Sequence, residues 1–293
     1  MEPKVHVFEK HRPLLEGLAY RMLGVRADAR DVVQETFLRW SAAEDIDDPR
    51  AWLVTVCSRI ALNALQSARA RREVYVGTWL PEPFDGPNGE DPLDRLQVDH
   101  TISMALMHAL ERLTPPERAS LLLHDVYGYT FDEIATMLRR PSTACRKLAS
   151  RARDRVREAK PRFTASADEH RRLLAAFLVS VRAGDREQLQ TLLTAEAELH
   201  ADGGGKAKTI RRVLRGPKAI TKFYVALWRA LDVVEGRLYV ESCWLNGAPG
   251  LLMYEKGELA AAVSMSIAGG KIHRIYAHRN PEKLNGIPRG VVC

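Results

Sequence analysis

The sequence is poor in cysteine and has no long apolar run, and both shortages exclude whole classes of protein. Only four cysteines occur among 293 residues, with no CxxC pair and no cysteine–histidine spacing suited to zinc. Reduced thiols are therefore expected, without a disulfide framework or a metal site. No apolar stretch approaches the roughly 20 residues of a membrane span, and the opening MEPKVHVFEKHR lacks the apolar stretch of a signal peptide. We expect a cytoplasmic protein with no membrane partner.

Charge is spread unevenly along the chain, although the overall excess is a modest +7. Residues 139–162 carry ten basic side chains and two acidic ones, and residues 206–222 carry seven basic side chains and no acidic one. Such runs are either solvated faces or surfaces for an acidic partner such as nucleic acid. With 46% hydrophobic and 28% charged residues, the chain otherwise has an ordinary globular composition, which excludes disorder.

The spacing of apolar residues and the placement of proline and glycine divide the chain into two helical parts and a mixed part. Both helical parts repeat apolar residues every three or four positions, and a stretch rich in proline and glycine separates them. The mixed part opens with an amphipathic helix around residues 174–181. The predicted bounds are 1–76 and 105–163 for the helical parts, 77–104 for the linker and 168–293 for the mixed part.

The mixed part is predicted to be α+β with a curved antiparallel sheet. Its later segments have the composition of strands, and two glycine-containing pairs, Lys256-Gly257 and Gly269-Gly270, are candidates for the turns between them. No internal repeat is present. The predicted strands are 238–244, 251–254, 259–267 and 272–278.

Residues 28–40, DARDVVQETFLRW, form a predicted helix with two distinct faces. Val33, Phe37 and Trp40 make an apolar stripe at helical spacing, which is expected to enter the core. The neighbouring face is mostly acidic, and it is either a solvated surface or a contact for a protein partner. Its members are Asp31, Gln34, Glu35 and Leu38.

The helix that follows has the opposite charge. From Trp52 onward it combines core positions with basic and polar residues that would suit a polyanion. Trp52 is either a core residue or an aromatic surface on which an unstacked base can stack. A basic helix beside an acidic face indicates two different partners, one a protein and one a polyanion. The basic and polar residues of this helix are Arg59, Asn63, Arg69, Arg71 and Arg72.

Residues 114–159 have the pattern of a helix-turn-helix. Thr114 and Thr130 are suitable N-caps, and a short turn, RRP, precedes the last helix. That helix turns small residues inward and presents polar tips that can reach base edges; a merely solvated basic face is the alternative. The inward set is Cys145, Ala149, Ala152 and Val156, and the outward set is Thr143, Arg146, Lys147, Ser150, Arg151, Arg153 and Arg157.

Both helical parts resemble regions of a bacterial sigma factor of the extracytoplasmic-function (ECF) group. DARDVVQETFLRW with DDPRAWLVTVCSRIALNALQSARARR is similar to region 2, and TFDEIATML, RRP and STACRKLASRARDRVREAK together are similar to region 4. The resemblance implies a transcription initiation factor rather than an enzyme, with no cofactor and no metal. The chain departs from the group's pattern at Arg30 and Asn63, where acids are usual, and at Arg139, where the turn usually has glycine.

The resemblance also implies partners and residue roles. The partners are core RNA polymerase, through its β′ clamp helices and β flap, and promoter DNA. Polymerase contacts fall on Asp31, Gln34, Glu35 and Leu38. Contacts to the −10 element fall on Arg50, Trp52, Arg59, Asn63, Arg69, Arg71 and Arg72. Contacts to the −35 element fall on Ser142, Thr143, Arg146, Lys147, Ser150 and Arg151.

Three further motifs resemble those of an ECF subfamily with a fused C-terminal SnoaL-like (NTF2-like) domain. They are YVGTWLPEPF, DGGGK and NPEKL, in that order along the chain. The resemblance implies that the extra domain packs on the sigma domains, contacts polymerase and tunes activity in cis, in place of a separate anti-sigma factor. The residues implied are Trp79, Leu80, Pro81, Glu82, Pro83, Asp202, Gly203, Gly204, Gly205, Lys206, Asn280, Pro281, Glu282, Lys283 and Leu284.

Two other functions remain open from the residues. SnoaL-like folds include enzymes with an Asp/His pair in a conical pocket, and His200, Asp202, Tyr254 and His273 are available here, although no catalytic arrangement stands out. The chain could thus be a ligand-responsive transcription regulator whose pocket binds or converts a small molecule. A plain helix-turn-helix repressor is a third reading, but it leaves the helix at residues 28–40 unexplained.

Overall fold

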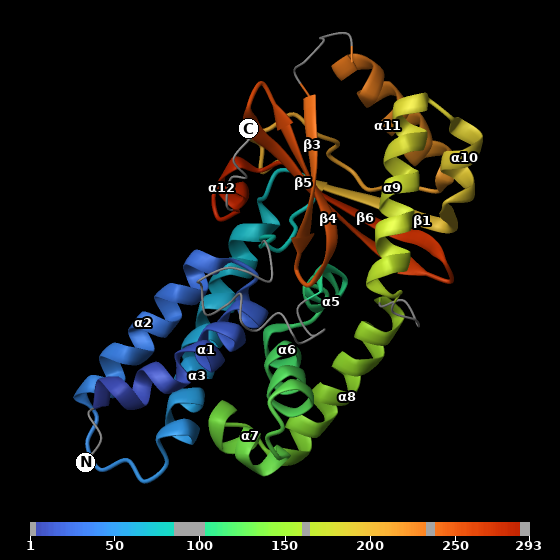
Figure 1. Cartoon of the computed structure of the whole chain (residues 1–293). Coiled ribbons are helices and arrows are strands. Elements are labelled where there is room, and N and C mark those ends of the chain that lie inside the picture. Colours follow the sequence, from blue (N-terminus) through green and yellow to red (C-terminus); the bar gives the residue numbers. More distant parts are fainter. Residues whose placement is uncertain (1–3, 85–102, 160–164, 233–237, 288–293) are drawn as a thin grey trace. The chain divides into compact units, whose positions relative to one another are not determined.

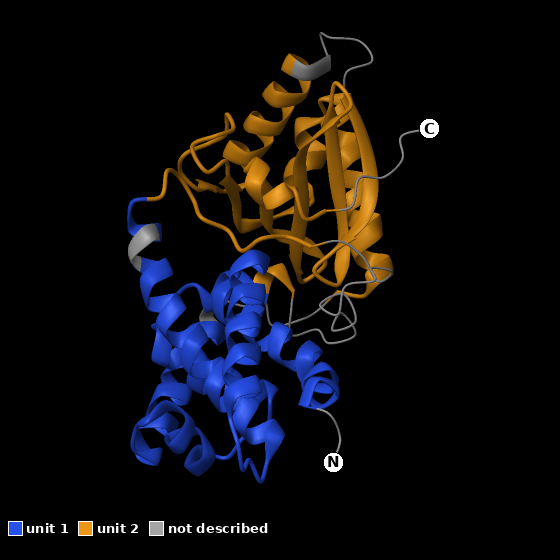
Figure 2. Ribbon diagram, turned by 90° about the vertical axis from the view of Figure 1, so that its left-hand side faces the viewer, with its two compact units in different colours: residues 1–74, 88–102, 106–159 blue, residues 75–87, 103–105, 160–293 orange. Residues whose placement is uncertain are grey.

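A computed structural model describes residues 4–84, 103–159, 165–232 and 238–287. The chain forms two compact units, each with its own core (Figure 2). The described part of the predicted linker begins in unit 2, because residues 75–84 pack there and not with the helices before them. Unit 1 consists of residues 1–74, 88–102 and 106–159, and unit 2 of residues 75–87, 103–105 and 160–293.

The first half of unit 1 is a bundle of three helices, α1 (Lys4–Leu23), α2 (Arg26–Ala42) and α3 (Pro49–Glu73). Asp48 caps α3 by accepting a hydrogen bond from the Ala51 amide at 3.0 Å, and Pro49 occupies the first helical position. Trp40 and Trp52 pack with ring centroids 5.7 Å apart. Cys57 lies in this core, where burial raises the pKa of its thiol to about 12, so the thiol stays protonated.

The second half of unit 1 contains the predicted helix-turn-helix. Thr114 and Thr130 begin two of its helices, and each forms a capping box with the glutamate three residues later. Arg139 ends α7 in the left-handed conformation, at φ 52°, so a non-glycine residue takes the position that favours glycine. The elements are α5 (Met104–Leu110), α6 (Pro115–Leu121), a π-helical stretch η3 (Leu122–Val126), α7 (Phe131–Leu138) and α8 (Ser142–Ala159).

Unit 2 is a six-stranded sheet with helices against it (Figure 1). The strand order is β2-β1-β6-β5-β4-β3. The strands are β1 (Leu193–Asp202), β2 (Leu214–Arg215), β3 (Leu238–Leu245), β4 (Ala248–Glu255), β5 (Glu258–Ala268) and β6 (Lys271–His278). The helices are α9 (Ala167–Ala183), α10 (Arg186–Thr191), α11 (Pro217–Asp232) and α12 (Pro281–Leu284).

The sheet confirms the four predicted strands and their antiparallel pairing, but the sheet as a whole is not antiparallel. β3 to β6 form three antiparallel hairpins, two of them at the predicted turns, whereas β1 pairs parallel with β6. The prediction of an antiparallel sheet was therefore wrong, and the sheet is mixed. The sequence missed β1 because its run TAEAELHA is rich in alanine and glutamate, which favour helices over strands.

The two faces of the sheet are covered differently. Phe177 of α9 and Tyr224 of α11 pack with sheet residues such as Val263 and Ile275 in one apolar core. The other face packs with α12, with Leu80 after α3 and with the start of α5. On that face Leu80 and Met104 pack against the buried Tyr276 of β6. Leu80 and Met104, at the two described ends of the predicted linker, are thus part of the core of unit 2.

Candidate polymerase, promoter and strap-docking sites

Helix α2 exposes most of the face predicted to contact polymerase. Asp31 and Gln34 are exposed, and Glu35 is half-buried and pairs with Arg39 at 2.9 Å. Leu38 is 54% exposed. The apolar stripe faces inward, with Trp40 only 4% exposed. An apolar side chain among carboxylates is a combination that a protein partner can cover.

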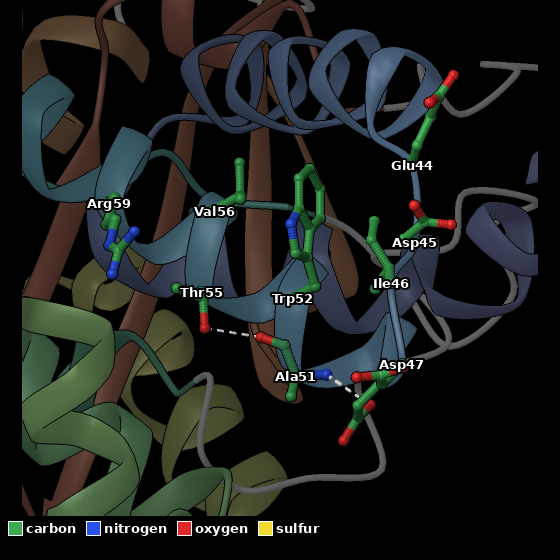
Figure 3. Close-up of a pocket in the computed structure, with 10 residues that line it drawn as sticks. Glu44, Asp45, Ile46, Asp47, Ala51, Trp52, Thr55, Val56 and Arg59 are labelled. Atoms are coloured by element: carbon green, nitrogen blue, oxygen red, sulfur yellow. Dashed lines mark hydrogen bonds between the residues drawn. The ribbon is translucent and has the colours of Figure 1, made fainter.

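A pocket of about 400 Å³ opens where α2 connects to α3 (Figure 3). Trp52, Thr55 and Arg59 of α3 line one side, and the acidic connection lines the other. Trp52 is half-buried, so its ring is neither fully in the core nor free in solvent. The pocket therefore combines an aromatic wall with carboxylate acceptors and one guanidinium. Its other lining residues are Glu44, Asp45, Ile46, Asp47, Asp48, Ala51 and Val56.

Two residues predicted to read the −10 element bind the second half of unit 1, although Arg69 is also exposed to solvent. Arg59 donates to the carbonyls of Met137 at 2.7 Å and Thr136 at 2.9 Å, and so caps the C-terminal end of α7. Arg69 donates to the Leu113 carbonyl at 3.1 Å. Desolvation lowers the pKa of the Arg59 guanidinium, and the neighbouring Arg139 adds to that effect.

Arg72 belongs to a second, more buried set of contacts. It pairs with Glu111, which also pairs with Arg118 at 2.5 Å. Arg118 is 1% exposed, and its Nε donates to the Arg21 carbonyl at 2.8 Å. The network joins α1 and α3 to the segment around α6. Burial lowers the pKa of the Arg72 guanidinium, and the Glu111 carboxylate opposes that effect.

The remaining −10 candidates are placed differently. Arg50 is exposed and lies over the ring of Tyr129, 5.3 Å from its centroid. Asn63 is exposed. The side chain of Arg71 lies outside the described residues. The structure thus brings part of the predicted −10 surface into contact with the helix-turn-helix and leaves part of it open.

Helix α8 presents the arrangement predicted for the −35 reader. Of the predicted inward face, Cys145, Ala149 and Ala152 are fully buried and Val156 is half-buried. Arg146 is exposed but lies over the Phe131 ring, 5.4 Å from its centroid, and Arg151 approaches Glu117 at 3.4 Å. Ser142 is half-buried, and the other outward candidates, Thr143, Lys147 and Ser150, are exposed.

The segment Tyr75–Phe84, called the strap below, is a peptide without regular secondary structure that is docked on unit 2. Its second half, Leu80 to Phe84, is buried. The Pro81 carbonyl accepts a hydrogen bond from His278 Nε2 at 2.9 Å, and the Phe84 carbonyl accepts one from the Asn246 amide at 3.1 Å. Burial lowers the pKa of His278 to about 4, so the imidazole is neutral and its Nε2–H can donate.

Asp202 is the centre of the strap contacts, and its side chain is fully buried. One carboxylate oxygen accepts from the Tyr75 hydroxyl at 2.6 Å and from the Gly204 amide at 3.1 Å. The other accepts from the Leu80 amide at 2.9 Å and from Lys283 Nζ at 2.7 Å. A buried carboxylate with four donors is fully satisfied, so it holds three separate segments of the chain in register.

Lys283 and Asn280 complete the cluster from the NPEKL motif. The Lys283 ammonium also donates to the Leu80 carbonyl and lies over the Trp79 ring, 4.1 Å from its centroid. Asn280 donates to the Tyr75 hydroxyl at 2.9 Å, while its amide oxygen caps α12. Desolvation raises the pKa of the Tyr75 phenol, and the Asp202 carboxylate raises it further, so the hydroxyl remains a donor.

The glycines of DGGGK are required by close packing. Gly204 has φ +60°, and a Cβ there would lie 2.4 Å from the Asn280 amide nitrogen and 3.0 Å from the Tyr75 hydroxyl. A Cβ on Gly203 would lie 2.5 Å from the Ala207 carbonyl oxygen. Only glycine can fill these positions without displacing the cluster. Lys206, next along the chain, forms an exposed pair with Glu282.

The residues considered for catalysis are occupied in other ways. All donors around Asp202 come from the chain itself, and His200 bonds to Glu198 at 3.0 Å. His273 is half-buried and lies 3.2 Å from the Thr194 hydroxyl. Within residues 4–84, 103–159, 165–232 and 238–287, no group of histidine, cysteine, aspartate and glutamate could hold a metal ion. No helix in those ranges is long and apolar enough to cross a membrane.

Comparison with known proteins gives a consistent result. The family model Sigma-70 region 2 matches residues 7–71, and that of Sigma-70, region 4 matches residues 103–156. ECF RNA polymerase sigma factor SigJ of Mycobacterium tuberculosis is 35% identical over 97% of this chain and 94% of its own length. Probable ECF RNA polymerase sigma factor SigI of the same species is 32% identical over 97% of this chain and 96% of its own.

The crystal structure of M. tuberculosis SigJ, an extracytoplasmic function sigma factor, matches the whole architecture. It superposes with a TM-score of 0.79 at 32% identity and covers 98% of this chain and 100% of that chain. The helical parts, the helix-turn-helix and the mixed sheet thus agree with both the sequence and the structural comparisons. This chain belongs to the family of ECF RNA polymerase sigma factors, with sigma-70 regions 2 and 4 followed by an α+β domain.

Proposed function

We propose that this sigma factor binds core polymerase through α2, reads the −10 element at the pocket beside Trp52 and reads the −35 element with α8, under the control of unit 2. The observation that carries the proposal is that one chain has three chemically different surfaces. Helix α2 has an acidic face with an exposed leucine, an aromatic pocket opens where α2 connects to α3, and α8 has an outward basic face. Run-off transcription with core polymerase tests it as a whole.

The polymerase contact can be tested apart from folding. We expect the double change Asp31→Lys and Glu35→Lys to abolish co-purification with core polymerase, because it reverses the charge of the exposed face. Asp31 is exposed and Glu35 has only its pair with Arg39, so the melting temperature should change little. The matched control Glu187→Lys and Glu196→Lys changes two exposed acidic side chains of unit 2 and should leave co-purification intact. Unaltered binding of the first variant would refute the assignment.

The pocket fits the capture of an unstacked base. Removing a base from the duplex costs a few kcal/mol, and stacking on an aromatic side chain returns roughly 1–3 kcal/mol per base. Trp52 provides the stacking surface, and carboxylates such as Asp47 and Asp48 can accept hydrogen bonds from the exocyclic amino group of cytosine or adenine. Arg59 would supply the positive charge that a nearby phosphate needs.

The −35 assignment makes a prediction that separates base contacts from phosphate contacts. Arg146→Ala or Lys147→Ala should cost about 1–3 kcal/mol and relax preference at one position where the side chain contacts a base. Where the side chain contacts phosphate, the change should weaken binding to all sequences and flatten the salt dependence. Binding of −35 duplexes with single base changes, measured at several salt concentrations, distinguishes the two. Equal transcription by both variants from a −35-dependent promoter would contradict the assignment.

The arginines of α3 make contacts with region 4 at side chains that were predicted to contact the promoter. Arg59, Arg69 and Arg72 each bind a carbonyl or carboxylate of residues 111–137. These contacts hold the guanidinium groups against region 4 and leave fewer of their five N–H donors for a phosphate. We therefore infer that the observed unit 1 is a closed state, and that binding to polymerase and promoter releases these contacts.

Unit 2 is connected to this switch by the strap. The strap begins two residues after α3 ends, so it is the first part of the connection between regions 2 and 4. Ten residues of free chain span at most about 33–36 Å, and docking on unit 2 removes that reach from the connection. Undocking would restore it. The SnoaL-like part thus controls in cis how far apart the two promoter-reading regions can move. The absence of a separate anti-sigma factor stays a prediction.

A further inference from the structure

A second basic surface lies in unit 2, away from the sigma regions in sequence. Residues 206–222, called the basic segment below, run from the DGGGK motif through β2 into α11. Ile210, Leu214 and Ile220 pack into the apolar core beneath it. The basic side chains point the other way, because Lys208, Arg211, Arg212, Lys218 and Lys222 are all exposed. The core therefore fixes the segment so that its cations face solvent.

Most of the basic side chains of the segment have no ion pair with an acidic residue in the part of the chain that the structure describes. Two further basic residues of the segment are paired: Lys206 with Glu282, and Arg215 with Glu198 at 3.1 Å. The structure gives no ion pair with a described acidic residue for the five exposed side chains named above, and the segment itself contains no acid. An unneutralised group of like charges repels itself and attracts a polyanion.

The N-terminal end of α11 adds to the positive charge of the basic segment. The first turn of α11 has no acidic residue, and Lys218 and Lys222 lie one turn apart on its exposed side. Cations near a helix N-terminus oppose the helix dipole and are unfavourable there, whereas anions are favoured. By contrast, α9 carries Asp168 and Glu169 in its first turn. An external anion would offset the unfavourable charge at this end of α11.

The composition of the surface favours nucleic acid over an acidic protein. Protein interfaces need apolar or aromatic side chains at their centre, and the exposed large apolar residues of the described chain include none in the basic segment. Interfaces with DNA are polar and strongly positive. We propose that the basic segment binds the phosphate backbone of duplex DNA without reading sequence, as a third DNA contact beyond the −10 and −35 readers.

The test uses the full chain and a fluorescent 30-base-pair duplex of mixed sequence without a promoter. We expect Arg211→Gln with Arg212→Gln to flatten the dependence of binding on salt. Each lost phosphate contact should reduce the affinity ratio between 50 and 200 mM salt by about 3.5-fold, because the logarithmic slope changes by about 0.9 per contact. Lys218→Gln with Lys222→Gln should act in the same direction.

The control is Arg186→Gln with Lys271→Gln, two exposed cations of unit 2 outside the segment, which should keep the wild-type slope. Melting curves show that all variants are folded. A wild-type slope in both segment variants would overturn the proposal. A wild-type slope together with weaker binding to core polymerase would also overturn it, and would assign the surface to an acidic protein partner. The readout uses no promoter, so the proposed −10 and −35 assignments can fail without affecting it.

Discussion

Asp202→Ala is expected to release the strap and to lower the free energy of unfolding of unit 2 by about 3–5 kcal/mol, the cost of breaking a buried ion pair by removing one partner. The Lys283 ammonium, which is 8% exposed, would lose its pair with the Asp202 carboxylate. The Tyr75 hydroxyl and the Leu80 amide would lose their acceptor.

Limited proteolysis with chymotrypsin measures this release directly. The strap contains Tyr75 and Trp79, two aromatic sites that docking should protect. Cleavage after them should be rapid in the Asp202→Ala protein and slow in the wild type, with thermal melts recording the loss of stability. Glu282→Ala is the matched control, because it removes only the exposed pair with Lys206 and should cost at most about 1 kcal/mol. Equal protection in all three proteins would contradict the role given to Asp202.

Glu111→Gln is expected to open unit 1 and to raise transcription. Glu111 is the shared counter-ion of Arg72 and Arg118, and the latter is almost fully buried. Removing its charge weakens the closed state while leaving the promoter-facing side chains in place. A shift of about 1–3 kcal/mol between closed and open forms changes output about five- to 150-fold. The measurement is run-off transcription per active holoenzyme.

Two comparisons distinguish the opening of unit 1 from a loss of folding. Thermal melting and circular dichroism show whether the Glu111→Gln protein is still folded. Asp168→Asn removes the charge of the carboxylate that pairs with Arg171 on α9, outside the two sigma regions, and should leave output unchanged. A folded Glu111→Gln protein that transcribes no better than wild type would contradict the idea that these contacts restrain the factor.

Local signals in the sequence were sufficient to predict much of the fold. The caps at Thr114 and Thr130 and the turn at Gly269-Gly270 were predictable because each depends on neighbouring residues. β1 was not predictable, since its composition favours a helix and only its neighbours in the sheet make it a strand. Parallel pairing with β6 joins segments more than 70 residues apart, and no local pattern encodes it.

The candidate sites also divide into features that local sequence predicts and features that depend on contacts between distant residues. The exposed face of α2 and the inward face of α8 follow from helical periodicity. The three motifs around the strap were identified by resemblance, but the chemistry that joins them was not, because Asp202 and Lys283 lie 81 residues apart. The Glu111 network was missed entirely. An arginine on a basic helix looks the same in sequence whether it awaits a phosphate or already binds a carboxylate.

Pulsed electron paramagnetic resonance tests the central claim most directly, which is that regions 2 and 4 are closed on each other in the free factor and separate at the promoter. Spin labels at Ala42 of α2 and Asp154 of α8, both exposed, would report the distance after the natural cysteines are replaced by alanine. The account predicts a single short distance in the free chain and a longer one with core polymerase and promoter DNA. The same distance distribution in both states would contradict it.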